Sequence, residues 1–276
     1  MSGIAHFSSS RFEHRTDVSV GDWIAPRLAG DFGAVGLVCP TGFEAYARVF
    51  HPVGETRLRW AEVCAATGRT PHPLMQWAGI SGTLHGAHYF GDWQNGEPDE
   101  GALDVGALAT LADAIGGDAA ITIGVWVGYG QYNEGSTSSF ALSFYAEDGA
   151  EPPLEPEPTP TDGLRPTFGV DLPSSATLNV PGREYGLFRG RLAILRDPDW
   201  PRASGWAWRW RHTLNLAWPD DRSWFVASEI DFDSTIVGGS RELIDRVLAS
   251  DLETSEVAAT SDLSSEGDRL NPLESA

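Results

Sequence analysis

The sequence predicts an α+β fold, with a mixed, largely antiparallel sheet and about three helices. Runs rich in β-branched and aromatic residues, such as Ile121–Val127, are separated by turn residues, which is typical of antiparallel strands. Amphipathic segments follow such runs near both ends of the chain, at Arg57–Thr67 and at Arg241–Ala249. Helices that follow strands in this way pack as a layer against a sheet.

Strands are expected where short apolar or alternating runs end at Gly, Pro or Asn. Ala34–Cys39 is a nearly continuous apolar run between Gly and Pro, which favours a buried strand. Trp206–Trp218 and Ser223–Phe232 alternate between apolar and polar residues, as half-buried strands do. The remaining expected strands are Tyr46–Phe50, Ile121–Val127, Phe140–Tyr145 and Arg183–Leu195, with one short strand after residue 252.

Helices are expected where apolar residues share one face and a capping residue precedes them. Gly68 and Gly116 follow two of these segments and are suited to end a helix. The three expected helices, each with its N-cap, are Arg57–Thr67 with Thr56, Val105–Ile115 with Asp104, and Arg241–Ala249 with Ser240.

The composition predicts a single domain with a flexible segment at each end of the chain. Residues 1–20 are polar and Ser-rich, so a flexible arm is expected there. Residues 260–276 are rich in Ser, Asp and Glu, which predicts an acidic disordered tail. Residues 21–259 are expected to form a single domain with a Pro/Glu-rich surface insertion at 147–166. Two linked half-domains are the alternative.

The charge balance argues against nucleic acid and membrane partners. The chain carries 39 acidic and 19 basic residues, a net charge of −20, and every basic residue is Arg. Such a chain repels phosphate groups and anionic membrane surfaces. No apolar stretch approaches the ~18 residues of a membrane span, and the first residues lack the apolar centre of a secretory signal. With only two cysteines, a cytoplasmic location is expected.

The most informative segment is WPDDRSWFVASEIDFDSTIVGGS, residues 218–240. If it is extended, Glu229, Asp231 and Asp233 share one face, opposite Trp224 and the apolar side chains that follow it. Three neighbouring carboxylates need a positive partner, water or a hard cation. Arg222 or the arginines of the preceding strand could pair with them. A solvated or Arg-paired face is the simplest interpretation, and a ligand or acid–base site, approached by His212, is the alternative.

Two further features could bind a ligand. Gly238, Gly239 and Ser240 precede a helix, where free backbone amides can hold an anion, although a simple strand-to-helix turn explains them as well. A row of tryptophans on one strand face can stack on a ligand, anchor a protein interface or pack in the core. This row is Trp206, Trp208 and Trp210.

Motifs of known chemistry are missing from the sequence. It has no Gly-x-Ser-x-Gly, no phosphate-binding loop and no dinucleotide fingerprint, and no cofactor or metal is expected. The sequence therefore favours a non-catalytic, cytoplasmic protein-binding or accessory module, for example an immunity-like protein that masks a basic partner. The alternative is a small hydrolase or ligand-processing enzyme that uses Glu229, Asp231 and Asp233, with or without a divalent cation.

Three blocks of the sequence resemble a family of bacterial proteins of actinobacterial type whose activity is uncharacterised. The first block is residues 218–240, quoted above. The others are PGREYGLFRG at residues 181–190 and RVFHPVGETRLRWAEVCAATGRTPHPLMQW at residues 48–77. The resemblance covers most of the chain outside its ends and the Pro/Glu-rich stretch. It implies no particular activity and no catalytic residues.

Overall fold

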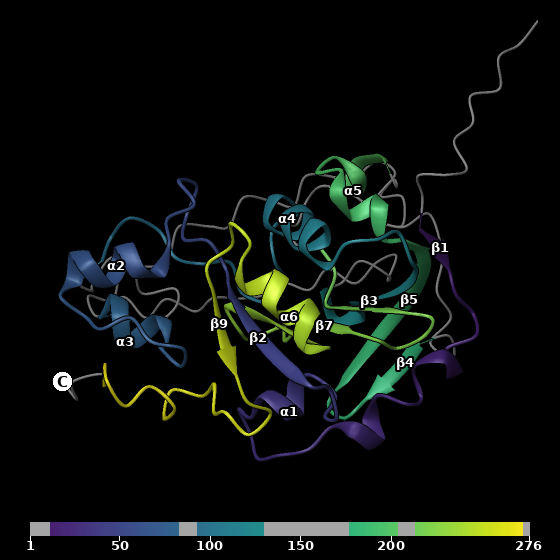
Figure 1. Cartoon of the computed structure of the whole chain (residues 1–276), viewed down its shortest axis with the longest axis horizontal. Helices are drawn as coiled ribbons and strands as arrows, with labels where there is room; N and C mark the ends of the chain where they lie inside the picture. The colour runs from purple at the N-terminus through teal and green to yellow at the C-terminus, as the bar shows by residue number, and fades with distance from the viewer. Residues whose placement is uncertain (1–11, 83–92, 130–176, 204–212, 273–276) are drawn as a thin grey trace, which may run out of the picture.

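A nine-stranded antiparallel sheet forms the centre of the molecule (Figure 1). The computed structural model describes residues 12–82, 93–129, 177–203 and 213–272. The strand order is β1-β5-β3-β6-β7-β8-β2-β9, with β4 paired to β5, which confirms the predicted α+β class. The strands are β1 Glu13–His14, β2 Ala45–Phe50, β3 Ala120–Trp126, β4 Thr177–Val180, β5 Arg183–Arg191, β6 Leu216–Pro219, β7 Phe225–Ser228, β8 Ser234–Gly239 and β9 Thr254–Val257.

Both faces of the sheet are covered. On one face, helices α4 (Val105–Ile115) and α6 (Arg241–Leu248) pack on the strands and form the helix-side core. On the other face, the N-terminal segment that contains α1 (Val35–Val38) forms the N-terminal-side core. Figure 1 shows α6 near the centre of the view beside β2, and α1 below β2. Because both faces are covered, the central strands have no solvated polar face.

The three predicted helices are present. They are α2 (Trp60–Thr67), α4 and α6. The Asp104 carboxylate accepts hydrogen bonds from the amides of Gly106 and Ala107 at the start of α4, as predicted. Ser240 caps α6, and Gly68 ends α2 with a left-handed backbone. The N-cap of α2 is Arg59 and not Thr56, so that helix begins three residues after the predicted start.

Three short helices were not predicted. One of them, α3 (Trp77–Ser81), packs beside α2 around a third apolar cluster that includes Trp60. Figure 1 shows this pair at one end of the molecule. The other two are α1 and α5 (Trp200–Ala203). Within the described ranges, no helix is long and apolar enough to span a membrane.

The predicted strand at Ala34–Cys39 is wrong, because its centre is the single helical turn α1. A short buried apolar run has the same composition in a helix and in a strand. The amides of Val35 and Gly36 donate to the carbonyls of Ser261 and Ala259, in the C-terminal part of the chain. The conformation therefore depends on a contact more than 200 residues away.

The chain ends are packed where the structure describes them, contrary to the loose arm and tail expected from composition. In the predicted arm at 1–20, Glu13 and His14 pair with β5. In the predicted tail at 260–276, Leu263, Asp268 and Asn271 are buried. The predicted strand at Arg183–Leu195 is shorter in the structure, as β5, and β6 includes the end of the predicted strand at Trp206–Trp218, of which residues 206–212 lie outside the described ranges. Phe140–Tyr145 and the insertion at 147–166 lie outside the described residues.

Candidate functional site

The acidic segment turns back on itself and does not continue as a strand. β7 ends at Ser228, and the chain reverses over Glu229–Asp233 before β8 begins. On β7, Val226 contributes to the helix-side core and Ala227 to the N-terminal-side core. The alternation of side chains on β7 was therefore predicted correctly, but both of its faces are apolar. The prediction of three carboxylates on one strand face is wrong.

Glu229 and Asp231 meet at the same arginine. The Arg183 Nε lies 3.0 Å from Glu229 Oε1, and its Nη2 lies 2.8 Å from Asp231 Oδ2. The Asp231 amide donates to the other Glu229 oxygen at 2.7 Å, which holds the turn closed. Arg183 begins β5, and its guanidinium also lies over the Trp126 ring. The positive partner that the acids require is therefore supplied by a different strand.

Asp233 is separated from the other two acids and is buried. Its carboxylate pairs with Arg48 Nη2 at 3.5 Å, and the Arg48 side chain is 1% exposed. Arg48 also donates to the Ser234 hydroxyl and to the carbonyl of Met75. Burial lowers the pKa of Arg48, and Asp233 opposes that shift. Asp233 thus neutralises a buried structural charge.

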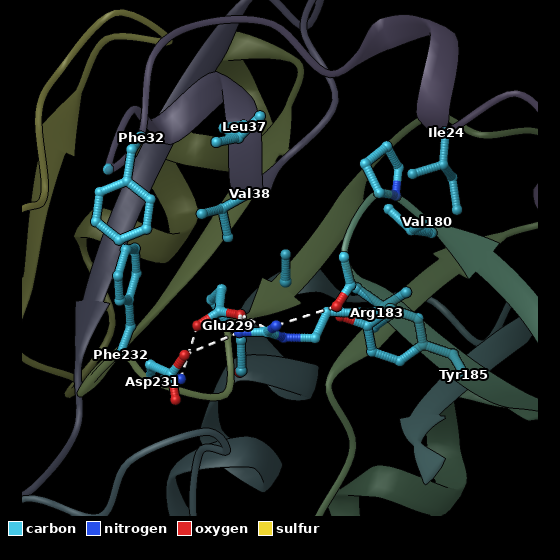
Figure 2. A pocket seen from close by; sticks show the side chains of 16 residues that line it. Ile24, Phe32, Leu37, Val38, Val180, Arg183, Tyr185, Glu229, Asp231 and Phe232 are labelled. Carbon is cyan, nitrogen blue, oxygen red and sulfur yellow. Dashed lines mark hydrogen bonds and ion pairs between the residues drawn. The ribbon is translucent and has the colours of Figure 1, made fainter. Parts of the chain in front are cut away.

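Arg183, Glu229 and Asp231 lie along one side of an apolar pocket, here called the Arg183 pocket (Figure 2). Its volume is about 300 Å³. Figure 2 shows the ion pairs between two groups of apolar side chains, with Phe32 and Phe232 on one side. The principal apolar residues of the lining are Ile24, Phe32, Leu37, Val38, Tyr185 and Phe232.

Two exposed hydrophobic side chains lie at this pocket. Among the described residues, the exposed large hydrophobic side chains are Phe32 at 85%, Leu37 at 38% and Leu270 at 60%. Phe32 and Leu37 both line the Arg183 pocket. Apolar groups gathered at the mouth of a pocket are typical of a surface that binds another molecule.

The remaining candidates do not join this pocket. Arg222 lies over the Trp23 ring, 5.4 Å from its centroid, and has a left-handed backbone. Gly238 and Gly239 are the last two residues of β8, and the Ser240 side chain caps α6, so the strand passes directly into the helix. Trp206, Trp208, Trp210 and His212 lie outside the described residues.

A buried chain of hydroxyl groups ends at a histidine. Burial lowers the pKa of His51, so the ring is neutral near pH 7. Its Nδ1 lies 2.6 Å from the Asp99 carbonyl and must donate there, so Nε2 accepts from the Thr235 hydroxyl at 2.8 Å. Ser228 then donates to Thr235. Ser228 is among the residues that line the Arg183 pocket, but its hydroxyl donates to Thr235 and Thr235 donates to His51, so both hydroxyl groups are engaged within this buried chain of hydrogen bonds.

The described side chains offer no metal centre. No group of three or more His, Cys, Asp or Glu side chains within the described ranges could hold a metal ion. Each carboxylate of the predicted acidic face is instead engaged by an arginine.

Sequence reasoning missed the two parts that make the pocket. Arg183 follows the Pro181-Gly182 turn, and only the pairing of distant strands places it beside Glu229. Phe32 stands in a polar loop with no periodic pattern around it. The one available signal was an isolated Phe in a Gly/Asp-rich loop, since loops of that composition seldom bury a large ring.

Comparison with known proteins adds no relative: no family model, no curated protein and no solved structure matches the chain.

Proposed function

We propose that this protein is a non-catalytic, cytoplasmic binding module that docks a protein partner at the Arg183 pocket. The observation that carries the proposal is the position of Phe32 and Leu37, two of the three exposed large hydrophobic side chains in the described ranges, on one pocket. Apolar anchors and the pockets they surround supply most of the free energy of protein association.

The state of the acids supports binding over catalysis. A general base or a metal ligand needs a carboxylate with an oxygen directed at the reacting group. Glu229 is instead fixed by Arg183 and by the Asp231 amide, and Asp233 is buried against Arg48, so the three acids do not converge on one point. Asp231 keeps one oxygen for a further contact, but its side chain is 71% exposed to solvent. The two cysteines are free and buried, which suits the reducing conditions proposed for the protein.

The proposal is tested with a neutral apolar dye, N-phenyl-1-naphthylamine, whose fluorescence rises in apolar sites. We expect the wild-type protein to bind the dye and Phe32→Ser to bind it roughly tenfold more weakly, because about 1.4 kcal/mol of apolar contact is lost. The matched control is Leu270→Ser, which removes the exposed apolar side chain that lies away from the pocket. Equal dye binding by all three proteins would contradict the proposal.

A further inference from the structure

We infer that the partner segment held in the Arg183 pocket places a lysine or arginine next to an apolar side chain. This inference rests on the proposed function and adds the chemistry of the partner.

The charged lining of the pocket carries a net negative charge. Among the described residues, the charged side chains that line it are Arg183, Glu229 and Asp231, so one positive charge faces two negative ones and the sum is −1. The whole chain, at −20, has the same sign. A basic segment is attracted by both the pocket and the surrounding protein, whereas an acidic segment is repelled by both.

Asp231 is the acid that can accept a further cation. Glu229 uses one oxygen for Arg183 and the other for the Asp231 amide, and its side chain is 21% exposed. Asp231 gives Oδ2 to Arg183, and its side chain is 71% exposed. Within the described part of the chain, no side chain or amide donates to Asp231 Oδ1. An ammonium or guanidinium group can therefore pair with Asp231 without displacing Arg183.

The apolar lining indicates that the partner segment also carries an apolar group beside its cation. Phe32 and Phe232 both line the pocket, and Figure 2 shows them on the same side of it as Asp231. A volume of about 300 Å³ is at the lower end for ligand pockets and suits one or two side chains. The methylene stem of a lysine or arginine can pack on the rings while its charged end reaches Asp231.

The chain's own Pro/Glu-rich stretch is a poor occupant for this pocket. Residues 130–176 contain eight acidic residues and one arginine. Such a segment has the same sign of charge as the pocket. Residues 204–212, which include Arg209 and Arg211 among tryptophans, do have the required chemistry, so the experiment must distinguish them from a partner.

The test uses the full chain and three acetylated, amidated peptides of sequence Gly-Phe-X-Leu-Gly, in which X is Lys, Gln or Glu. Binding is followed by NMR titration. We expect the Lys peptide to bind about two- to fivefold more tightly than the Gln peptide, which is the gain of an exposed ion pair, and the Glu peptide to bind most weakly. The preference for Lys should disappear in 1 M NaCl, where the Debye length is about 3 Å.

Asp231→Asn should remove the preference for Lys over Gln, measured as the ratio of the affinities of the two peptides for the same variant. The matched control is Asp220→Asn, because Asp220 is also an exposed acid paired with an arginine, Arg189, and does not line the pocket. Retention of the Lys preference in Asp231→Asn would overturn the inference.

The remaining outcomes separate the two proposals. If the Gln peptide binds and Lys gives no gain, the inference fails and the proposed function stands. If none of the peptides binds and Phe32→Ser leaves dye binding unchanged, both fail. If the double variant Arg209→Gln with Arg211→Gln binds the Lys peptide more tightly than the wild type does, the chain's own segment is the occupant and the inference is overturned.

Discussion

Two acids only four residues apart, Glu229 and Asp233, meet opposite environments. Glu229 lies at the margin of a pocket, whereas Asp233 faces a guanidinium that is almost fully removed from water. Arg48 also lies over the Phe50 and Trp60 rings. Desolvation makes a buried charge very costly unless its partner stays in place. Asp233, which the sequence placed among the candidate catalytic acids, is thus expected to stabilise the fold.

Replacing Asp233 by Asn should lower the free energy of unfolding by about 3 kcal/mol, because the Arg48 charge loses its counter-charge in the interior. Urea unfolding followed by circular dichroism measures the change. The control is Asp220→Asn, which breaks an exposed ion pair and should cost less than about 1 kcal/mol. A small loss in Asp233→Asn, similar to that of the control, would show that the buried pair contributes little.

His51 makes stability depend on pH. Burial lowers the pKa of His51 below its ordinary value of 6.5 in the folded protein, while the unfolded chain keeps that value. Below pH 6.5 the unfolded state therefore binds more protons than the folded state, and stability falls as the pH falls. The expected loss is up to about 1 kcal/mol between pH 6.5 and 5.5. Urea unfolding of His51→Gln over the same range should give a shallower slope; an unchanged slope would exclude His51 as the cause.

At the scale of elements, β8 explains the double glycine that looked like an anion-binding turn. β8 pairs with both β7 and β2 and is buried along its whole length. A Cβ at Gly238 would lie 2.6 Å from Phe43 Cδ2 and 3.0 Å from Cys39 Sγ. A Cβ at Gly239 would first meet Leu243 Cδ2, at 3.2 Å. A side chain at position 238 would thus overlap the N-terminal-side core. A side chain at position 239 would make a close contact with α6 that a small shift of Leu243 could relieve.

Gly238→Ala should therefore destabilise the protein by about 1–3 kcal/mol, the usual cost of overpacking a core. Gly239→Ala should cost less, because a flexible leucine side chain can move by a few tenths of an ångström. Thermal unfolding of both variants measures the difference. If Gly239→Ala proved the more damaging of the two, the crowding seen around Gly238 would not be the reason for its glycine.

Elements with strong local signals were predictable, and elements that depend on distant contacts were not. The α4 helix has an apolar stripe, a capping aspartate and a terminal glycine, and each of these acts within a few residues. α1 depends on carbonyls of the C-terminal part of the chain, and no local pattern encodes them. The turn at Glu229–Asp233 also depends on a distant contact, because Arg183, which pairs with Glu229, is 46 residues away in the sequence. Of the predicted strand Ser223–Phe232, only Phe225–Ser228 is a strand, β7.

At the scale of the whole molecule, the C-terminal part of the chain holds the α2–α3 end to the sheet domain. The Asp268 carboxylate accepts hydrogen bonds from His72 Nε2, at 2.7 Å, and from the amides of Gln76 and Asn271. Asn271 in turn exchanges hydrogen bonds with the backbone of Thr70. Composition predicted a disordered tail here because it registers polar residues and not the contacts that they make.

Asp268→Asn should lower the free energy of unfolding by about 2 kcal/mol at pH 7, because several hydrogen bonds to a buried charged group are weakened. Burial by itself would raise the pKa of Asp268, but the amides of Gln76 and Asn271 and the contact with His72 outweigh it and lower the pKa overall. The stabilisation by this carboxylate is therefore present above its ordinary pKa of 3.8 and is lost as the pH falls through the lower folded-state value.

The difference in stability between wild type and Asp268→Asn should consequently shrink when the pH is lowered from 7 to below about 4. Urea unfolding at several pH values measures it. The matched control is Glu266→Gln, which changes an exposed acid two residues away and should alter stability by less than about 0.5 kcal/mol. If Asp268→Asn were as mild as this control at pH 7, residues 260–272 would contribute little to the fold, and their packing against α3 would be incidental.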